Sequence, residues 1–533
     1  MSNYSSILLL PVLLACVQGI GRAEGGELRE IIDRDIRAVW AKKKLAAPEQ
    51  SSDSVFLRRV YLDLAGMIPS YEEATAFLAD AEPNKREKLI DKLLADPRYA
   101  RNQAQVWDVS LLGRSPNRVG RPENRQRFRQ WLLKQFERNE PYDRFVHKLL
   151  AAEEQDSQLY HVVHGDADEL ATATMRHFLG RQLQCAKCHD HPFDSWTQRD
   201  YYGMVGFFVR TYVKEGEQQD NVTRYFVGER STGEVSFTLL PKDAQPGANE
   251  EPVKPKFLEG EELQEPPPPP DFKEPESKNK NAPPAPLFSR RQKVIEWTTS
   301  KKNPYLAEAV VNRVWAQFMG RGFVHPVDDF NAANDPSHPQ LIETMEAECI
   351  AHDFDLKWLI REIVCSEAYQ TADVGPSEEA MPKFYERARV RPLSVEELIA
   401  SLHVATGLGL ESALKSVPSK DMVEYLGQPT DGQGTFQGSL TEHLFLHNGD
   451  VFRGLCSPRN GNLAESLLES EDDWNAKVER MFLSVLCRTP STEERERFVE
   501  YLSVDPKDSK LASQRIEEAL WVLVSCSEFR FNR

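Results

Sequence analysis

Hydrophobic residues recur every three or four positions along most of the chain, which is the spacing that one face of a helix requires. This pattern appears on both sides of the middle of the sequence, at Ile31, Ile32, Ile36, Val39 and Trp40 and again at Val310, Val311, Val314, Trp315 and Phe318. Two Ser-x-x-Glu capping boxes, starting at Ser70 and Ser491, mark helix starts because serine and glutamate side chains satisfy amides of a first turn. The pattern predicts a mainly α protein.

The helical pattern breaks between residues 212 and 286. Residues 224–227 and 234–238 have the alternation and aromatic content of short strands. A charged, Pro-rich stretch follows over 259–286 and includes five consecutive prolines at 266–270, a composition that favours extended chain over a packed core. We therefore predict two helical domains, 27–211 and 287–533, joined by a small β-containing excursion and a Pro-rich linker over 212–286.

The N-terminus has the features of an export signal. Residues 7–17 are an apolar run too short to span a membrane, and Gly21-Arg22-Ala23 supplies small residues for a cleavage site. We predict a signal peptide over residues 1–23 and a periplasmic or secreted protein. A second interpretation is a lipoprotein signal in which Leu13-Leu14-Ala15-Cys16 is a lipobox and Cys16 carries a lipid anchor.

Composition narrows the function classes. Lys and Arg number 66 and Asp and Glu number 83, so the formal net charge is −17. A surface this acidic repels phosphate backbones, so we expect no nucleic-acid partner. After the first twenty residues no apolar stretch reaches the roughly 18 residues of a membrane span, so we also expect no transmembrane segment.

The segment Cys185-Ala-Lys-Cys188-His189 carries the most distinctive chemistry. Two thiols one helical turn apart can add to the two vinyl groups on one edge of haem, and the following imidazole can ligate the iron. Export favours this interpretation because bacteria attach haem covalently outside the cytoplasm. We predict haem c held by Cys185 and Cys188, with His189 as the proximal iron ligand.

The surroundings of the predicted haem are less defined by the sequence. His177 and Met204 are candidates for the distal ligand, and Met175 is a further one. Arg181 and Arg210 are either partners for the propionates or solvated surface residues. A set of nearby aromatic residues would line either a porphyrin or an ordinary core, namely Phe193, Trp196, Tyr201, Tyr202, Phe207 and Phe208.

Other chemistries remain open for the same segment. Cys185, Cys188, His189 and His191 could bind zinc through two thiolates and two imidazoles. A non-haem metal could instead be surrounded by four residues, His189, Asp190, His191 and Asp194. The two cysteines could also form a disulfide or a redox-active dithiol.

Three further groups of residues have weaker signals. One loop region could either line a pocket or serve turn and cap chemistry, and contains His325, Asp328, Asp329, Asp335 and His338. His443 and His447 have the i,i+4 spacing of helical metal ligands, which also occurs on ordinary surface helices. The widely spaced cysteines are either buried packing residues or disulfide partners, for example Cys349 with Cys365, and comprise Cys349, Cys365, Cys456, Cys487 and Cys526.

Several of these motifs together resemble a known family. The planctomycete cytochrome-c-like domain is suggested by Arg58-Arg59-Val60-Tyr61-Leu62-Asp63-Leu64-Ala65-Gly66, Phe178-Leu179-Gly180, the segment from Cys185 to Asp194, and Asp200-Tyr201-Tyr202. A planctomycete-specific C-terminal domain is suggested by Asn303-Pro304-Tyr305, Val311-Asn312-Arg313-Val314-Trp315, Pro336-Ser337-His338-Pro339, Arg391-Pro392-Leu393-Ser394 and Ser527-Glu528-Phe529-Arg530-Phe531-Asn532. The resemblance implies a two-domain, exported architecture, but the function of this family is unknown.

The sequence thus favours an exported haem-binding protein that acts in redox chemistry or electron transfer with a periplasmic redox partner. Two alternatives remain: a metal-dependent hydrolase and a non-catalytic scaffold, either of them acting on exported polymers. Whether the protein is an enzyme is left open.

Overall fold

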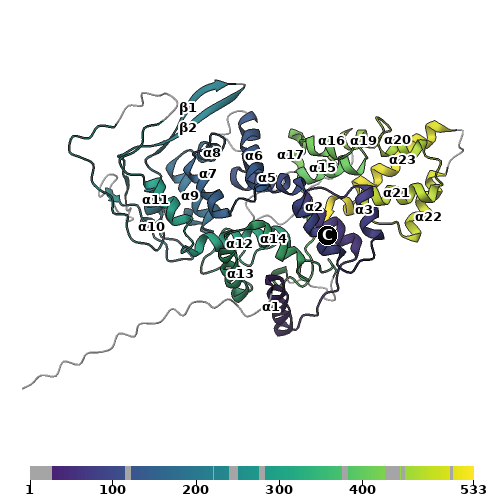
Figure 1. The fold of residues 1–533 in the computed structure, drawn as a ribbon, viewed down its shortest axis with the longest axis horizontal. Coiled ribbons are helices and arrows are strands. Elements are labelled where there is room, and N and C mark those ends of the chain that lie inside the picture. Colours follow the sequence, from purple (N-terminus) through teal and green to yellow (C-terminus); the bar gives the residue numbers. More distant parts are fainter. Residues whose placement is uncertain are drawn as a thin grey trace, which may run out of the picture.

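The computed structural model describes residues 27–114, 122–219, 221–238, 250–274, 283–374, 382–426, 444–445, 450–503 and 508–533. It is mainly helical, as the sequence predicts (Figure 1). The predicted signal peptide, Cys16 and the pair His443 and His447 lie outside these residues. Within them, no helix has both the length and the hydrophobicity needed to cross a membrane.

Helices fill the segment before the predicted excursion. They are α1 (Leu28–Lys43), α2 (Asp53–Ala65), α3 (Tyr71–Ala79), α4 (Lys85–Ala95), α5 (Pro97–Leu112), α6 (Pro122–Glu137), α7 (Tyr142–Ala151), α8 (Leu159–His164), α9 (Ala167–Phe178), the 3₁₀ helix η1 (Leu183–Lys187) and α10 (Gln198–Val205). Side-chain caps start several of them, including the predicted capping box of Ser70 and Glu73. A second capping box, Thr197 with Asp200, opens α10.

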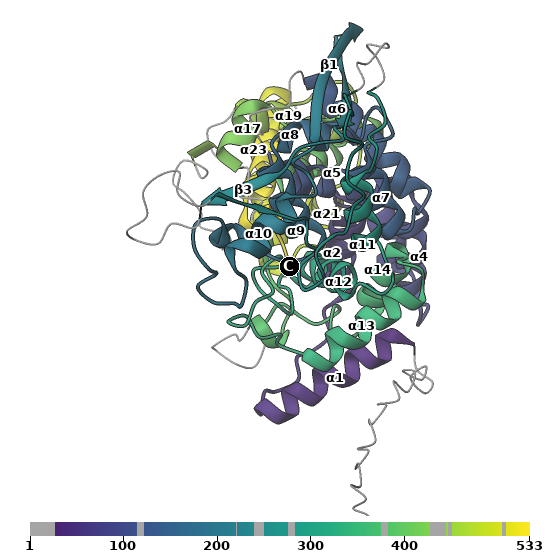
Figure 2. The same cartoon turned by 90° about the vertical axis from the view of Figure 1, so that its left-hand side faces the viewer.

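The predicted strands are confirmed inside two antiparallel pairs. Strand β1 (Thr211–Gln219) pairs with β2 (Val222–Glu229), and β3 (Val235–Thr238) pairs with β4 (Glu250–Val253). The β1–β2 hairpin extends beyond the neighbouring helices in both views (Figures 1 and 2). The sequence did not indicate β1, because its second half, Glu215-Gly216-Glu217-Gln218-Gln219, lacks the hydrophobic alternation of a half-buried strand.

The remaining segment is helical again, apart from a short strand pair in which β5 (Arg391–Pro392) meets the C-terminal β6 (Phe531–Asn532). Its helices are α11 (Arg290–Thr298), α12 (Pro304–Met319), α13 (Pro339–Ala351), α14 (Leu356–Cys365), η2 (Pro382–Phe384), α15 (Val395–Ala405), α16 (Leu410–Lys415), α17 (Lys420–Leu426), α19 (Asp450–Cys456), α20 (Leu463–Glu469), α21 (Trp474–Leu486), α22 (Thr492–Leu502), α23 (Ser509–Ser525) and α24 (Ser527–Arg530). The predicted capping box of Ser491 and Glu494 opens α22.

The buried side chains form two large clusters. The first contains residues from α1 through α14, so helices on both sides of the Pro-rich stretch share one core, as Phe178 and Trp315 illustrate. The second contains residues of α15 to α24 together with Leu62 and Ile68. The change between clusters falls between Tyr385 and Leu393, whereas the sequence changes character near residue 287. The predicted domain boundaries therefore remain predictions.

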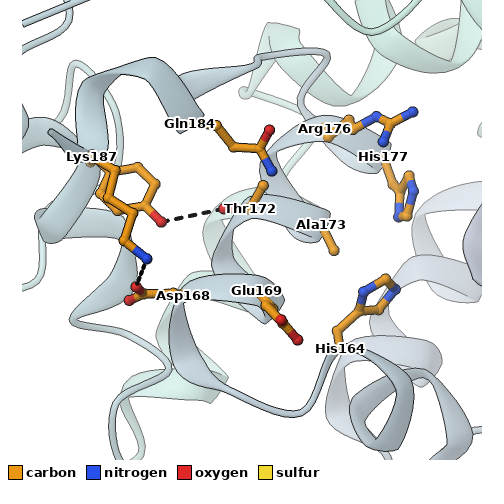
Figure 3. Close-up of a pocket in the computed structure, with 10 residues that line it drawn as sticks. His164, Asp168, Glu169, Thr172, Ala173, Arg176, His177, Gln184 and Lys187 are labelled. Atoms are coloured by element: carbon orange, nitrogen blue, oxygen red, sulfur yellow. Dashed lines mark hydrogen bonds and ion pairs between the residues drawn. The ribbon is translucent and has the colours of Figure 1, made fainter. Parts of the chain in front are cut away.

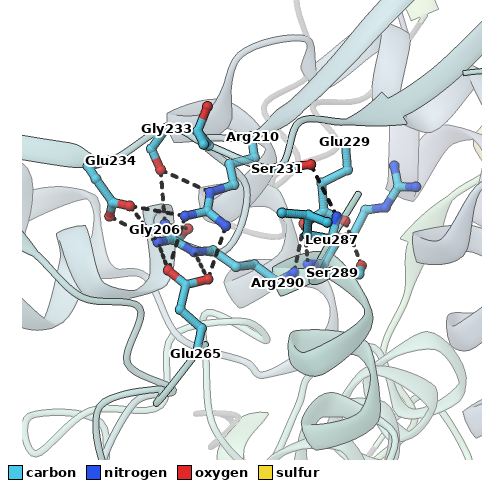
Figure 4. A network of polar contacts seen from close by, with 12 residues as sticks. Gly206, Arg210, Glu229, Ser231, Gly233, Glu234, Glu265, Leu287, Ser289 and Arg290 are labelled. Atoms are coloured by element: carbon cyan, nitrogen blue, oxygen red, sulfur yellow. Dashed lines mark hydrogen bonds and ion pairs between the residues drawn. The ribbon is translucent and has the colours of Figure 1, made fainter. Parts of the chain in front are cut away.

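Part of the predicted linker is fastened to the fold. Glu265 accepts hydrogen bonds from Arg210, at 3.0 Å from its Nη1, and from Arg290 (Figure 4). Glu234 binds the same two arginines, and Arg290, only 1% exposed, also donates to the carbonyl oxygens of Gly206 and Gly233 at 3.2 Å. This network joins the end of α10, the strands and the start of α11 through a residue of the Pro-rich stretch.

Candidate functional site

The Cys185 segment lies in a loop that is anchored at both ends. Helix α9 ends at Phe178, and Gly180 then turns the chain with a φ of +63°. A Cβ at this position would lie 2.9 Å from the ring of Phe330, whose backbone N–H donates to the Gly180 carbonyl at 2.9 Å. Glycine is therefore required here both by the backbone conformation and by the close contact.

The 3₁₀ geometry of η1 sorts its residues into two sides. Positions i and i+3 lie above one another in a 3₁₀ helix. Leu183 and Ala186 are buried and hold η1 against the core, while Cys185 and Cys188, the latter at the C-terminal cap, are exposed. Both thiols are free, so the disulfide interpretation is not realised in this structure.

A hydrogen bond to the next residue orients the His189 ring. Its side chain is exposed, and its Nδ1 lies 2.7 Å from the carbonyl oxygen of Asp190. Since a carbonyl oxygen only accepts, Nδ1 carries the hydrogen, and the lone pair of the ring is then on Nε2. Histidine ligands in metal sites are commonly oriented by this kind of hydrogen bond.

The other candidate ligands of the loop are engaged in local turns. The Asp194 carboxylate accepts from the Ser195 backbone N–H at 2.7 Å, and Asp190 accepts from the Gln198 backbone N–H at 3.3 Å. The backbone N–H of His191 donates to the Trp196 carbonyl at 2.8 Å. Among the described residues, no three His, Cys, Asp or Glu side chains are grouped closely enough to hold a metal ion. Neither set of non-haem ligands is therefore preassembled.

The distal-ligand candidates lie inside the protein. Met204 and Met175 are fully buried in the first cluster. His177 is 6% exposed, and its Nδ1 lies 3.2 Å from the hydroxyl of Tyr160. Burial, reinforced by His164 and two arginines, holds the pKa of His177 well below its ordinary value. His177 is thus a neutral imidazole at pH 7.

Most of the residues expected to surround a porphyrin pack in the core or form ion pairs instead. Four of the aromatic residues belong to the core, namely Trp196, Tyr201, Phe207 and Phe208, while Phe193 is 65% exposed. Arg181 forms an ion pair with Glu308 at 2.8 Å, and Arg210 is buried with Glu234 and Glu265. Neither arginine is the solvated residue or propionate partner that the sequence suggested, because each is held by a carboxylate of another element.

A cavity of about 380 Å³ borders the motif, and its lining residues are drawn in Figure 3. Gln184 and Lys187, on either side of Cys185, line it together with His177 and His164. The two imidazole rings are 5.8 Å apart, and burial lowers the pKa of His164 to about 4. Lys187 is tied to Asp168 by an ion pair of 2.6 Å. The sequence offered no motif that pointed to His164 or Asp168.

The described residues therefore fit the proximal side of a covalent haem but do not supply an accessible ligand for its distal side. The two free thiols and the oriented imidazole suit attachment and proximal ligation. The sequence-derived distal ligands are held in the core or by Tyr160. Of these, only His177 shares a cavity with residues adjoining the motif.

The loop cluster near residue 330 divides between two roles. His325, Asp335 and His338 line a second cavity. Asp328 is buried and binds Arg176 at 2.5 Å, and Asp329 accepts from the Asn334 side chain at 3.2 Å. Both interpretations of this cluster, pocket lining and turn chemistry, thus hold for different residues.

The remaining cysteines are packing residues. Cys349, Cys456 and Cys487 are buried, Cys365 and Cys526 are partly buried, and no disulfide links the described cysteines. Burial raises the pKa of the Cys349 thiol to about 12, so this thiol stays protonated. The Cys349–Cys365 disulfide is accordingly not formed.

Comparison with known proteins agrees with the two-part architecture. Residues 31–212 match the family model PSCyt2, a protein of unknown function (DUF1549), and residues 290–434 match PSD1, a protein of unknown function (DUF1553). These matches are consistent with a two-domain planctomycete family. They attach no activity to either part. No curated protein and no solved structure matches the chain.

Proposed function

We propose that this is an exported haem-binding protein that acts in redox chemistry or electron transfer, with haem c attached through Cys185 and Cys188 and ligated by His189. One observation supports this most directly. Two free, exposed thiols lie beside an imidazole whose Nδ1 is fixed by the Asp190 carbonyl, which leaves Nε2 as the ligand atom.

Bound haem would supply a one-electron couple at the protein surface. The chain's own residues would position it. Leu183 and Ala186 anchor η1 in the core, and the Thr197–Asp200 cap fixes the far end of the loop. An exposed site of this kind suits electron exchange with a periplasmic partner, and the signal-like residues 1–23 support export.

The test is covalent haem in protein exported from a host with cytochrome c maturation machinery. After acid–acetone extraction, the parent protein should give a c-type pyridine haemochrome spectrum, and the double variant Cys185→Ser/Cys188→Ser should give none. Cys365→Ser is the matched control, because it removes a thiol of the same fold outside the motif. It should retain the spectrum of the parent.

Two results would overturn the proposal. A folded, exported parent protein without a haem band would exclude haem c, and a band retained by the double variant would place the haem elsewhere. Metal analysis of the same preparations addresses the alternatives. Stoichiometric zinc that disappears in the double variant would favour a metal-dependent hydrolase, whereas the absence of both haem and metal would favour a scaffold.

A further inference from the structure

A second cavity, far from the Cys185 motif in sequence, has the composition of an anion site. Its volume is about 770 Å³, within the roughly 300–1,000 Å³ typical of small-molecule sites. It lies where the C-terminal half of α1 meets the start of α13, two helices that run side by side (Figure 2). Residues 321–341 and η2 complete its walls.

Cations predominate around this cavity although the whole chain has a net charge of −17. Lys42, Lys43, Arg321 and Lys383 line it, against two carboxylates, Asp35 and Asp335. Within the described part of the chain, none of these four cations forms an ion pair with a carboxylate. The ammonium groups of Lys43 and Lys383 both lie near the Phe384 ring, at 5.4 and 5.2 Å from its centroid. Like charges gathered in this way favour an anion between them.

The N-terminus of α13 faces the same space. This helix has 13 residues, and its N-cap, His338, makes no side-chain cap hydrogen bond. Pro339 has no N–H, and the next two residues, Gln340 and Leu341, line the cavity. The unpaired amides and the positive end of the helix dipole attract negative charge to such a position.

His338 gives an independent indication of a ligand. It is 3% exposed, its Nδ1 lies 3.0 Å from the Ser337 hydroxyl, and its buried Nε2 has no hydrogen-bond partner in the structure. Burial lowers its pKa to about 4, so the ring is neutral at pH 7. In the tautomer in which Nδ1 accepts the Ser337 proton, Nε2–H is a donor. Leaving a buried donor unpaired is unfavourable, and an acceptor on a ligand would offset that cost.

We propose that this cavity binds a small organic anion, whose oxyanion lies at the start of α13 among Arg321, Lys383 and His338. The nonpolar walls formed by Val39, Phe323 and Phe384 would cover the rest of such a ligand. The charged group is a carboxylate or a phosphate or sulfate ester, since all three accept the same donors.

Isothermal titration calorimetry of the full mature chain with phenyl phosphate, benzoate and inorganic phosphate tests this. We expect saturable millimolar or tighter binding of at least one probe, and the three probes distinguish a phosphate from a carboxylate site. Arg321→Gln/Lys383→Gln should weaken that binding about tenfold or more, because two charge-assisted donors are lost. His338→Gln should weaken it in the same direction.

The control is Lys214→Gln/Lys510→Gln, which changes the net charge equally at two exposed positions. It should bind like the parent. The proposal is wrong if no probe binds saturably to the parent, or if the Arg321→Gln/Lys383→Gln variant, shown to be folded by circular dichroism, binds as tightly as the control.

Discussion

Two polar motifs of this protein have opposite surroundings. On α2, Arg58, Arg59 and Asp63 are all 5% exposed or less, and every one is held by partners from the far end of the chain. Arg58 donates to the Phe529 carbonyl at 2.7 Å, and Asp63 accepts from Arg391 at 2.7 Å and Asn532 at 2.9 Å. In η1 and the residues directly after it, Cys185, Cys188 and His189 are exposed and have no partners from distant parts of the chain.

This difference suits the α2 network to a role in folding and the Cys185 segment to the binding role proposed above. The α2 network connects the first hydrophobic cluster to the C-terminal strand pair. Its charged groups are therefore bound to other residues of the protein and stabilise the fold. The thiols and imidazole of the Cys185 segment make no comparable contacts with distant residues, so they remain available for the ligand proposed above. The stabilities of single and double variants test this contrast.

Asp63→Ala should have the largest effect. It leaves Arg391, Asn532 and the hydroxyl of Tyr369, which donates to Asp63 at 2.8 Å, without their acceptor. Removing one partner of a buried pair costs about 3–5 kcal/mol. Urea unfolding followed by circular dichroism measures this cost. Asp91→Ala, at an exposed carboxylate of α4, is the control. If Asp63→Ala lowers the free energy of unfolding by less than about 1 kcal/mol, the α2 network does not contribute substantially to the stability of the fold.

Glu265→Gln should have the next largest effect. The neutral amide weakens the contacts to Arg210 and Arg290 that fasten the Pro-rich stretch, and Arg290 is almost fully buried. Hydrogen bonds to charged groups contribute about 1.5–3 kcal/mol, and we expect a loss in this range. Glu261→Gln, an exposed position of the same stretch, should change stability little. Equal effects of the two variants would show that the stretch is a simple linker.

These contacts also show which features of the fold can be predicted from the sequence. The helices, two strands and both Ser-x-x-Glu caps follow from local periodicity and cap chemistry. Local signals also identify the Cys185 motif, because the motif is defined entirely by the spacing of two cysteines and a histidine within five residues. They did not show that Glu265 pairs with Arg210 and Arg290, or that helices before and after the Pro-rich stretch share a core. Such contacts depend on which distant residues meet, and a single sequence does not encode that in any local pattern.

The same limit applies to the candidate sites. The histidines of the loop near residue 330 were recognisable as pocket candidates, but Lys42 and Lys43 of α1 were not, because they lie almost 300 residues away. His164 was missed for a similar reason, since it reaches the cavity beside the motif only through the packing of α8 on α9. Aromatic residues near the motif were ambiguous, and the structure assigns most of them to the core.

Glu346 lies between the α2 network and the Cys185 segment in its surroundings. It is a largely buried carboxylate, like Asp63, but its neighbours Glu308 and Glu343 carry like charges. Burial, with these neighbours, raises its pKa from 4.5 to about 8. The folded state therefore holds this proton more tightly than the unfolded state, so stability is lost as the pH rises from about 4.5 towards 8. Glu346→Gln should remove this loss and stabilise the protein by on the order of 1 kcal/mol at pH 8, where one pKa unit corresponds to about 1.4 kcal/mol.

Melting temperatures of the parent and Glu346→Gln across pH 4 to 9 test the sign of this effect. The two proteins should agree at the acidic end and diverge above neutrality, with the variant more stable. Glu496→Gln, at an exposed position of α22, is the control for the loss of one negative charge. A parent protein that is most stable at pH 8 would contradict the prediction.

The smallest effect should come from the motif itself. In cofactor-free protein, Cys185→Ser/Cys188→Ser changes two exposed thiols that form no disulfide and fill no core space. Substitutions of this kind usually stay within about 0.5 kcal/mol. Urea unfolding should therefore place the double variant beside the parent, whereas Ala186→Ser, which puts a hydroxyl at the buried position between the two cysteines, should be measurably less stable. If the double variant loses more stability than Ala186→Ser, the cysteines serve the fold, and the contrast between satisfied and bare motifs does not hold for this loop.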